Sequence, residues 1–142
     1  MNTITFKVPG QPSGWQRTGK NGKRVFNTKA NLNAKNAIGF AGNRAMGSRP
    51  PFKGAVKVSI IFVSHWPQSY TNKCKTMPNG FYKVTKPDVD NCAKQVMDAL
   101  NGICWADDNQ VAAIYCEKIH SDQGSWTSVS IEPLWEDERG AA

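Results

Sequence analysis

Hydrophobic and polar positions alternate in two segments of this chain, and two further segments are also typical of strands. Residues 4–8 alternate until Pro9 and Gly10, which predicts a short first strand. Residues 56–62 alternate in the same way and predict a strand buried on one face. Residues 110–118 and 125–131 predict two further strands joined by a polar connection.

Two other segments have the period of amphipathic helices. Small apolar residues recur at helical spacing from Thr28 to Ala45, although Gly39 and Gly42 weaken this helix. Apolar residues in the segment 89–100 stand at i, i+3, i+4, i+7, i+8 and i+11, and an Asn-Gly pair follows as a stop signal. Strands and two helices are therefore expected, with no repeat and no boundary of a second domain.

Length and composition favour one soluble globular unit. The chain has 142 residues, of which 39% are hydrophobic, enough for a single core. No apolar run approaches the ~18 residues of a membrane span, and the first ten residues lack the order of a signal peptide, so we expect a cytoplasmic protein without a membrane partner. The four cysteines are dispersed without a C-x-x-C pair, which predicts reduced thiols and argues against zinc.

The charges divide the chain into two parts. The formal net charge is +7, from 18 Lys+Arg and 11 Asp+Glu. All acidic residues lie at or after Asp88, whereas 15 of the basic residues lie at or before Lys86. A long basic part without acids predicts a polyanionic partner such as nucleic acid. Acids confined to the other part suggest a site.

Two basic segments are candidates for that partner. Residues 9–27 form a loop or hairpin rich in glycine and basic residues, and residues 64–86 form a long acid-free loop in which aromatics alternate with lysines. Such a mixture suits nucleic acid, because rings stack on bases while lysines follow phosphates. A solvated turn and an ordinary surface loop remain the alternatives. The candidate DNA-binding residues are Arg17, Lys20, Lys23, Arg24, Lys73, Lys75, Lys83 and Lys86.

Two acids stand where extended chain becomes helix. Pro87 favours an extended Lys86, so Asp88 falls at the junction and Asp90 in the first helical turn. Acids two residues apart point to opposite sides of a helix but to the same side of an extended segment, so a junction can direct both at one ion. Alternatively, Asp88 caps the helix and Asp90 interacts with its dipole, each stabilising it by ~0.5 to 1 kcal/mol without an ion.

Further charged residues could belong to the same ion site. Lys94 lies four residues after Asp90, either in a plain charge ladder or beside an anionic site. Asp107 and Asp108 follow the helix, and the eight residues from Asn101 span at most ~26 Å, enough to return along a helix of roughly 18 Å. A third carboxylate can then reach the first two. If it does not do so within one chain, a dimer partner can supply it.

Three carboxylates without histidine or cysteine form a hard oxygen site. Such a site suits Mg²⁺, with Mn²⁺ as a substitute, and argues against zinc or copper. In a basic protein it indicates hydrolysis of a phosphodiester. No Walker loop, dinucleotide-binding turn or serine elbow is present in the sequence.

The same residues resemble a known family. Residues 86–91 (Lys-Pro-Asp-Val-Asp-Asn), Lys94, residues 98–102 (Asp-Ala-Leu-Asn-Gly) and residues 105–111 (Trp-Ala-Asp-Asp-Asn-Gln-Val) resemble the central signature of the RusA family of Holliday junction resolvases. Acids, lysine, turn and tryptophan keep their order and spacing together. The opening strand, the Pro12–Ser13 turn and the lysine-rich loop are similar to the rest of the family's layout.

The resemblance implies both a fold and a function. The fold is α+β, a small mixed sheet packed with two main helices, in a single domain over residues 1–142 whose tail, 136–142, we expect to fray. The function is that of a homodimer that binds four-way DNA junctions and cuts two strands symmetrically with Mg²⁺. In that family the metal-holding acids correspond to Asp88, Asp90 and Asp108, and the essential lysine to Lys94. Asp107 would replace Asp108 if the register moved by one residue.

Two competing functions are consistent with the sequence. A related nuclease acting on flaps or replication forks would keep the metal residues and differ in its basic loops. A basic DNA-binding module without catalysis would use Asp88 and Asp90 only to stabilise the helix. Cleavage of branched DNA with and without Mg²⁺ separates these possibilities.

Overall fold

The computed structural model describes residues 3–14, 19–21, 24–26, 29–70 and 81–134. Its helices and strands follow one another as β1 (Ile4–Pro9), β2 (Gly19–Asn21), β3 (Arg24–Phe26), α1 (Lys29–Met46), β4 (Val56–His65), η1 (Gln68–Tyr70), α3 (Val89–Leu100), η2 (Asp108–Gln110), β5 (Val111–Ser121) and β6 (Trp126–Pro133). The predicted strands and the two main helices are confirmed.

A four-stranded mixed sheet organises the fold. Its strands lie in the order β1-β6-β4-β5, and β2 and β3 form a separate two-stranded sheet. β4 pairs with β6 in antiparallel and with β5 in parallel orientation, so β1 and β5 are the two edges. A parallel pair needs a crossover connection, and α3 lies within the one that joins β4 to β5.

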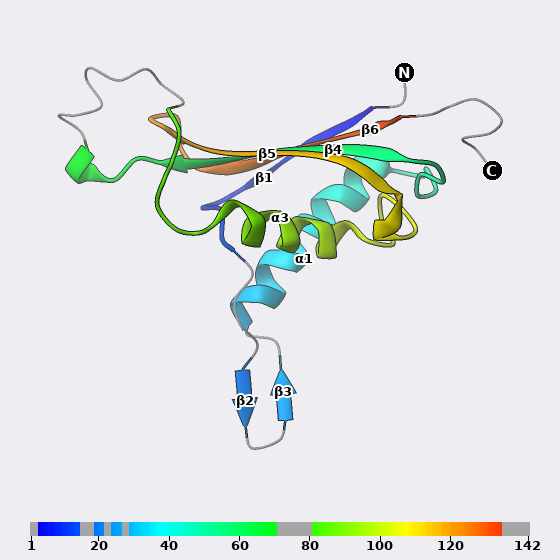
Figure 1. The fold of residues 1–142 in the computed structure, drawn as a ribbon, viewed down its shortest axis with the longest axis horizontal. Coiled ribbons are helices and arrows are strands. Elements are labelled where there is room, and N and C mark those ends of the chain that lie inside the picture. Colours follow the sequence, from blue (N-terminus) through cyan, green and yellow to red (C-terminus); the bar gives the residue numbers. More distant parts are fainter. Residues whose placement is uncertain (1–2, 15–18, 22–23, 27–28, 71–80, 135–142) are drawn as a thin grey trace.

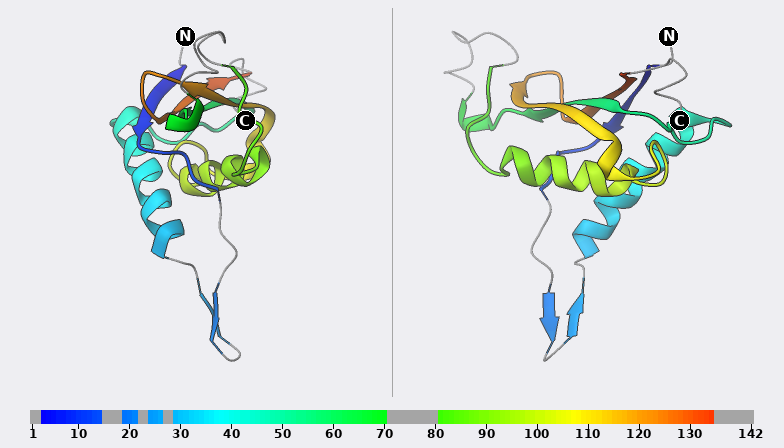
Figure 2. Two further views of the ribbon diagram at one scale, coloured as in Figure 1. Left: turned by 90° about the vertical axis from the view of Figure 1, so that its left-hand side faces the viewer. Right: turned by 45° about the vertical axis from the view of Figure 1, so that its right-hand side comes forward.

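The two helices cover one face of this sheet (Figures 1 and 2). Alternate residues of β4, such as Val58 and Ile60, are fully buried under them. α3 contributes Cys92, Val96 and Leu100 to the same core, which explains the apolar stripe of its sequence. The structure is α+β with two helices on one sheet, as expected, and no described helix is long and apolar enough to cross a membrane.

The glycines of α1 mark its close approach to α3. A β-carbon at Gly42 would lie 2.5 Å from Leu100 Cδ2, whereas one at Gly39 would be in ordinary contact, 3.4 Å from Ile103 Cδ1. Gly42 therefore allows α1 to pack closely against α3, although glycine is a poor helix former.

Among the described cysteines, Cys92, Cys104 and Cys116 are free thiols, as predicted. Burial raises the pKa of Cys92 to about 11 and that of Cys104 to about 12, so both remain protonated at neutral pH. Cys92 and Cys104 are constituents of the core, and Cys116 packs against it.

Replacing each of these glycines by alanine should have opposite effects on stability. Gly39→Ala should stabilise the protein by about 0.5–1 kcal/mol, because alanine is the better helix former. Gly42→Ala gains the same propensity but forces the buried Leu100 to move, which should cost about 1–3 kcal/mol. Urea unfolding of the two variants measures the difference. Equal stabilities would contradict the packing role of Gly42.

Candidate active site

Asp88 stands at the junction where the extended chain enters α3. Its backbone is extended (φ −69°, ψ 146°) and it is the N-cap residue of α3. Its carboxylate makes no capping hydrogen bond to the helix, and the residue is exposed. The capping alternative therefore lacks the hydrogen bond on which it depends.

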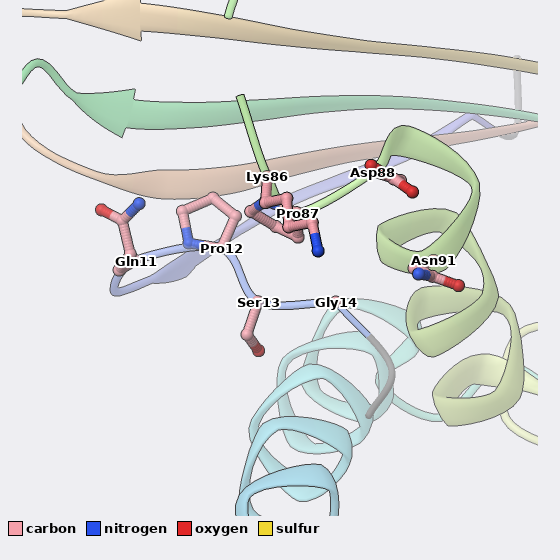
Figure 3. Close-up of a pocket in the computed structure, with 8 residues that line it drawn as sticks. All are labelled: Gln11, Pro12, Ser13, Gly14, Lys86, Pro87, Asp88 and Asn91. Carbon is pink, nitrogen blue, oxygen red and sulfur yellow. The ribbon is translucent and has the colours of Figure 1, made fainter. Parts of the chain in front are cut away.

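The segment after β1 passes across the start of α3 (Figure 3). A β-carbon at Gly14 would lie 3.0 Å from Pro87 Cβ and 3.2 Å from Asn91 Cβ, so glycine permits this close crossing. Ser13 Oγ also donates a hydrogen bond of 3.3 Å to Gln95 Oε1 of α3. The two segments enclose an open hollow of about 590 Å³, which is lined by Gln11, Pro12, Ser13, Gly14, Lys86, Pro87, Asp88 and Asn91.

Two lysines hold the chain that leads to Asp88. Lys118 Nζ, from β5, donates to the carbonyl oxygens of Thr85 and Pro87, each at 2.7 Å. Lys83 Nζ donates to Thr85 Oγ1 and, at 2.6 Å, to the carbonyl oxygen of Lys86. Charged donors make stronger hydrogen bonds than neutral ones, so these contacts fix the backbone immediately before Asp88.

These ammonium groups are close enough to affect each other. Partial burial, followed by the positive charge of Lys118, lowers the pKa of Lys83. The predicted DNA-binding residue Lys83 thus directs its ammonium to its own backbone. Lys86, by contrast, lines the hollow beside Asp88.

The second acidic pair is fixed by a different set of contacts. Asp107 is the N-cap of η2, accepting a hydrogen bond of 2.9 Å from the Asn109 amide in a capping box with Gln110. Asp108 Oδ1 instead accepts a bond of 2.7 Å from the indole N–H of Trp105, which is fully buried. Asp107 therefore has a structural task, while Trp105 orients the carboxylate of Asp108.

The connection after α3 is long enough to return along the helix, but it does not do so. The Gly102 amide donates to the Trp105 carbonyl at 2.7 Å, which closes a compact turn at the C-terminal end of α3. The chain returns only as β5, whose Lys118 reaches Pro87. The two acidic pairs therefore lie at opposite ends of a helix of ~18 Å.

A three-carboxylate ion site is consequently not assembled by the described part of one chain. Those residues contain no group of three or more His, Cys, Asp or Glu side chains that could hold a metal ion. The oxygen donors suit Mg²⁺, but Asp88 and Asp90 are separated from Asp108 by the length of α3. The possibility that remains from the sequence is that a second chain supplies the third acid.

Several predicted residues cannot be placed. Arg17, Lys23, Lys73 and Lys75 lie outside the described residues, and Lys20 and Arg24 are described only as backbone of β2 and β3. Their predicted contacts with DNA remain predictions. The predicted hairpin in this basic segment is confirmed by the pairing of β2 with β3.

Sequence reasoning missed two residues that shape the site. Lys118 looked like an ordinary polar position of a strand, and only the parallel pairing of β4 and β5 brings it to Pro87. Gly14 stood in a segment rich in glycine, proline and serine and carried no distinguishing signal. The Trp105 to Asp108 spacing of three residues was visible, but its hydrogen bond was not.

The sequence matches a known protein family and a protein of Bacillus subtilis. The family model described as Endodeoxyribonuclease RusA matches residues 9–132. The chain is also 31% identical over 132 residues to "Uncharacterized protein YqaN" of Bacillus subtilis (strain 168), and this match covers 87% of the chain and 92% of that protein. The matched region includes both acidic pairs and Lys118.

Lys118→Met should loosen the start of α3. The apolar side chain leaves two carbonyl oxygens without their charged donor, which should cost about 1–3 kcal/mol of stability. Hydrogen exchange should show faster opening of the first turn of α3, with Lys57→Met of β4 as the matched control. Unchanged protection of that turn in Lys118→Met would contradict the anchoring role.

Proposed function

Because the chain belongs to the RusA family of endodeoxyribonucleases, we propose that it resolves four-way DNA junctions by paired, Mg²⁺-dependent cleavage of two strands. The observation that carries this proposal is the position of Asp88. It is an exposed carboxylate at the start of α3 that makes no capping bond, and it lies beside a hollow with a lysine on its rim. Such a carboxylate is available to hold a cation against a phosphate.

The proposed ligands of the ion are Asp88, Asp90 and Asp108. When bound, Mg²⁺ polarises the phosphodiester, activates water and neutralises charge on the leaving oxygen. Asp88 and Asp90 would present oxygen ligands from the junction between extended chain and helix. Lys94, one turn after Asp90, would stabilise negative charge that develops on the phosphate.

Asp108 is a better candidate ligand than Asp107. One oxygen of Asp108 accepts a hydrogen bond from the Trp105 indole, which orients the carboxylate and leaves its second oxygen as the candidate ligand. Residues that orient a ligand in this way are common around metal sites. Asp107 already serves as the cap of η2, so its removal should disturb the turn as well as any site.

The DNA would be held by the basic part of the chain. Lys86 is next to the hollow, and the other candidates belong to the β2–β3 segment and to the long loop before α3. A homodimer would present two equal sites to a junction that can itself have two-fold symmetry. Recombination and repair are the processes in which such junctions need resolution, and a cytoplasmic location fits that role.

A flap- or fork-cleaving nuclease is the second candidate, since it would need the same acids. Comparison of four-way, flap, fork and linear DNA substrates under identical conditions decides between these activities. Preferential cutting of flaps would replace the proposed substrate while leaving the proposed acids intact.

Asp90→Asn should abolish junction cleavage in Mg²⁺ while retaining junction binding, because the amide loses the charge that holds the ion. Asp98→Asn is the matched control on the same helix, since Asp98 lines a groove against α1. Cleavage and gel-shift assays on one junction measure both properties. A wild-type protein that is inert with Mg²⁺ and Mn²⁺ on every branched substrate would instead identify a non-catalytic DNA-binding module.

The salt dependence of binding should distinguish the two lysines near Asp88. If Lys86 contacts a phosphate, Lys86→Ala should reduce the slope of log K against log salt by about one unit. Lys83→Ala should leave the slope nearly unchanged, because its ammonium binds backbone carbonyls. Fluorescence anisotropy across a salt series measures both slopes. Equal reductions would show that Lys83 also reaches the DNA.

A further inference from the structure

We propose that the groove between α1 and the outer edge of β1 binds an extended, acidic segment of a partner protein, which adds to the sheet as a further strand. The groove has a volume of about 680 Å³ and is lined by residues 5–9 of β1 and by one face of α1. It shares no lining residue with the hollow beside Asp88. The surface is therefore separate from the proposed cleavage site.

The backbone of β1 is suited to receive a strand. β1 is an edge of the four-stranded sheet, and in the described part of the chain no strand pairs with its outer side. The Gly10 amide donates to the Ser125 carbonyl at 3.2 Å, so residue 10 directs its N–H toward β6. By the alternation of a strand, residues 4, 6 and 8 do the same, whereas Thr5 and Lys7 direct an N–H and a C=O outward. Pro9, next in the outward row, has no N–H, as is typical of prolines in edge strands.

The helical wall of the groove is mainly apolar, and Figure 2 shows α1 beside β1. Phe40 of this wall is 69% exposed. Phe6 of β1 faces the same helix, since its Cζ lies 3.5 Å from the position of a β-carbon at Gly42. Apolar side chains on one face of an added strand would therefore contact this wall. Its residues stand at i, i+3, i+4, i+7 and i+8 of α1, namely Ala37, Phe40, Ala41, Arg44 and Ala45.

The charges of the groove favour an acidic segment. Lys7 and Arg44 line it, and no acidic residue is among the described residues that do so. Arg44 is exposed on the helical wall, whereas Lys7 lies on the other face of β1, with Nζ 4.9 Å from the ring centroid of Trp126. A strand added to β1 would thus meet a cation on each of its faces. Opposite charges across a strand pair stabilise it, and like charges destabilise it.

The same features discourage β1 from pairing with its own copy. Lysine and proline on an edge strand are common means by which proteins prevent association between like sheet edges. An antiparallel pair of β1 strands centred on Lys7 would place two ammonium groups opposite each other. The edge therefore excludes a second copy and accepts a strand of opposite charge.

A peptide fits this groove better than a strand of nucleic acid. An exposed phenylalanine beside two cations could also stack on a base. However, the edge of β1 presents carbonyl oxygens as well as N–H groups, and a peptide backbone can pair with both. A phosphate has only acceptor oxygens and would leave the outward carbonyl oxygens of Thr5 and Lys7 without a donor.

Two peptides of about eight residues test the chemistry of the partner. Both alternate valine with a charged residue, glutamate in one and lysine in the other, and both carry fluorescein. Fluorescence anisotropy with the full chain should show binding of the glutamate peptide at least about tenfold tighter than that of the lysine peptide, because only glutamate can pair with Lys7 and Arg44. Equal affinities, or no binding of the glutamate peptide at about 1 mM, would overturn the proposal.

Variants of α1 test the location. Arg44→Glu and Phe40→Ala should each weaken binding of the glutamate peptide by about tenfold, through charge reversal and through loss of an apolar contact. Lys35→Glu is the matched control, because Lys35 lines the groove between α1 and α3 instead. NMR-detected hydrogen exchange of the Thr5 and Lys7 amides should slow when the peptide binds. Unchanged exchange at both amides, or an equal loss of affinity in Lys35→Glu, would refute strand addition at β1.

The same variants identify other occupants of the groove. Both Arg44→Glu and Phe40→Ala should retain binding to four-way and single-stranded DNA while they lose the peptide. Loss of DNA binding in both would assign the groove to nucleic acid and overturn the proposal. The proposal would also be wrong if the peptide bound only to a protein shortened after Leu134, because the chain's own acidic end would then occupy the groove.

Discussion

The antiparallel packing of α3 against the β4–β5 pair is the constraint on which the rest of the site depends. β5 starts where α3 ends and brings Lys118 back to the carbonyls of Thr85 and Pro87. This contact fixes the backbone before Asp88, but the same geometry keeps Asp107 and Asp108 at the far end of the helix. The same packing arrangement thus positions Asp88 and separates it from Asp108.

The charge distribution follows the same geometry. The ammonium groups of Lys83 and Lys118 lie beside the backbone that precedes Asp88 and donate hydrogen bonds to its carbonyl oxygens. The formal charge of +7 is the sum of a basic part before Asp88 and an acidic part that contains the proposed metal ligands.

The sequence predicted the elements well because each had a strong local period. The stripe of residues 89–100 and the alternation of residues 56–62 coincide with α3 and β4. The placement of Asp88 at the junction was also predictable, since Pro87 precedes it. The distance between Asp88 and Asp108 was not predictable, because a connection that is long enough to return along α3 need not do so. The Gly102–Trp105 turn keeps this connection at the C-terminal end of α3. Lys118 escaped notice because its role arises from the register of β5 on β4.

A crystal structure of the protein with Mn²⁺, analysed by anomalous scattering, tests the account most directly. The account predicts a manganese peak at the N-terminal end of α3, coordinated by Asp88 and Asp90. A peak held by all three residues of a single chain, or at a location remote from Asp88, would contradict it.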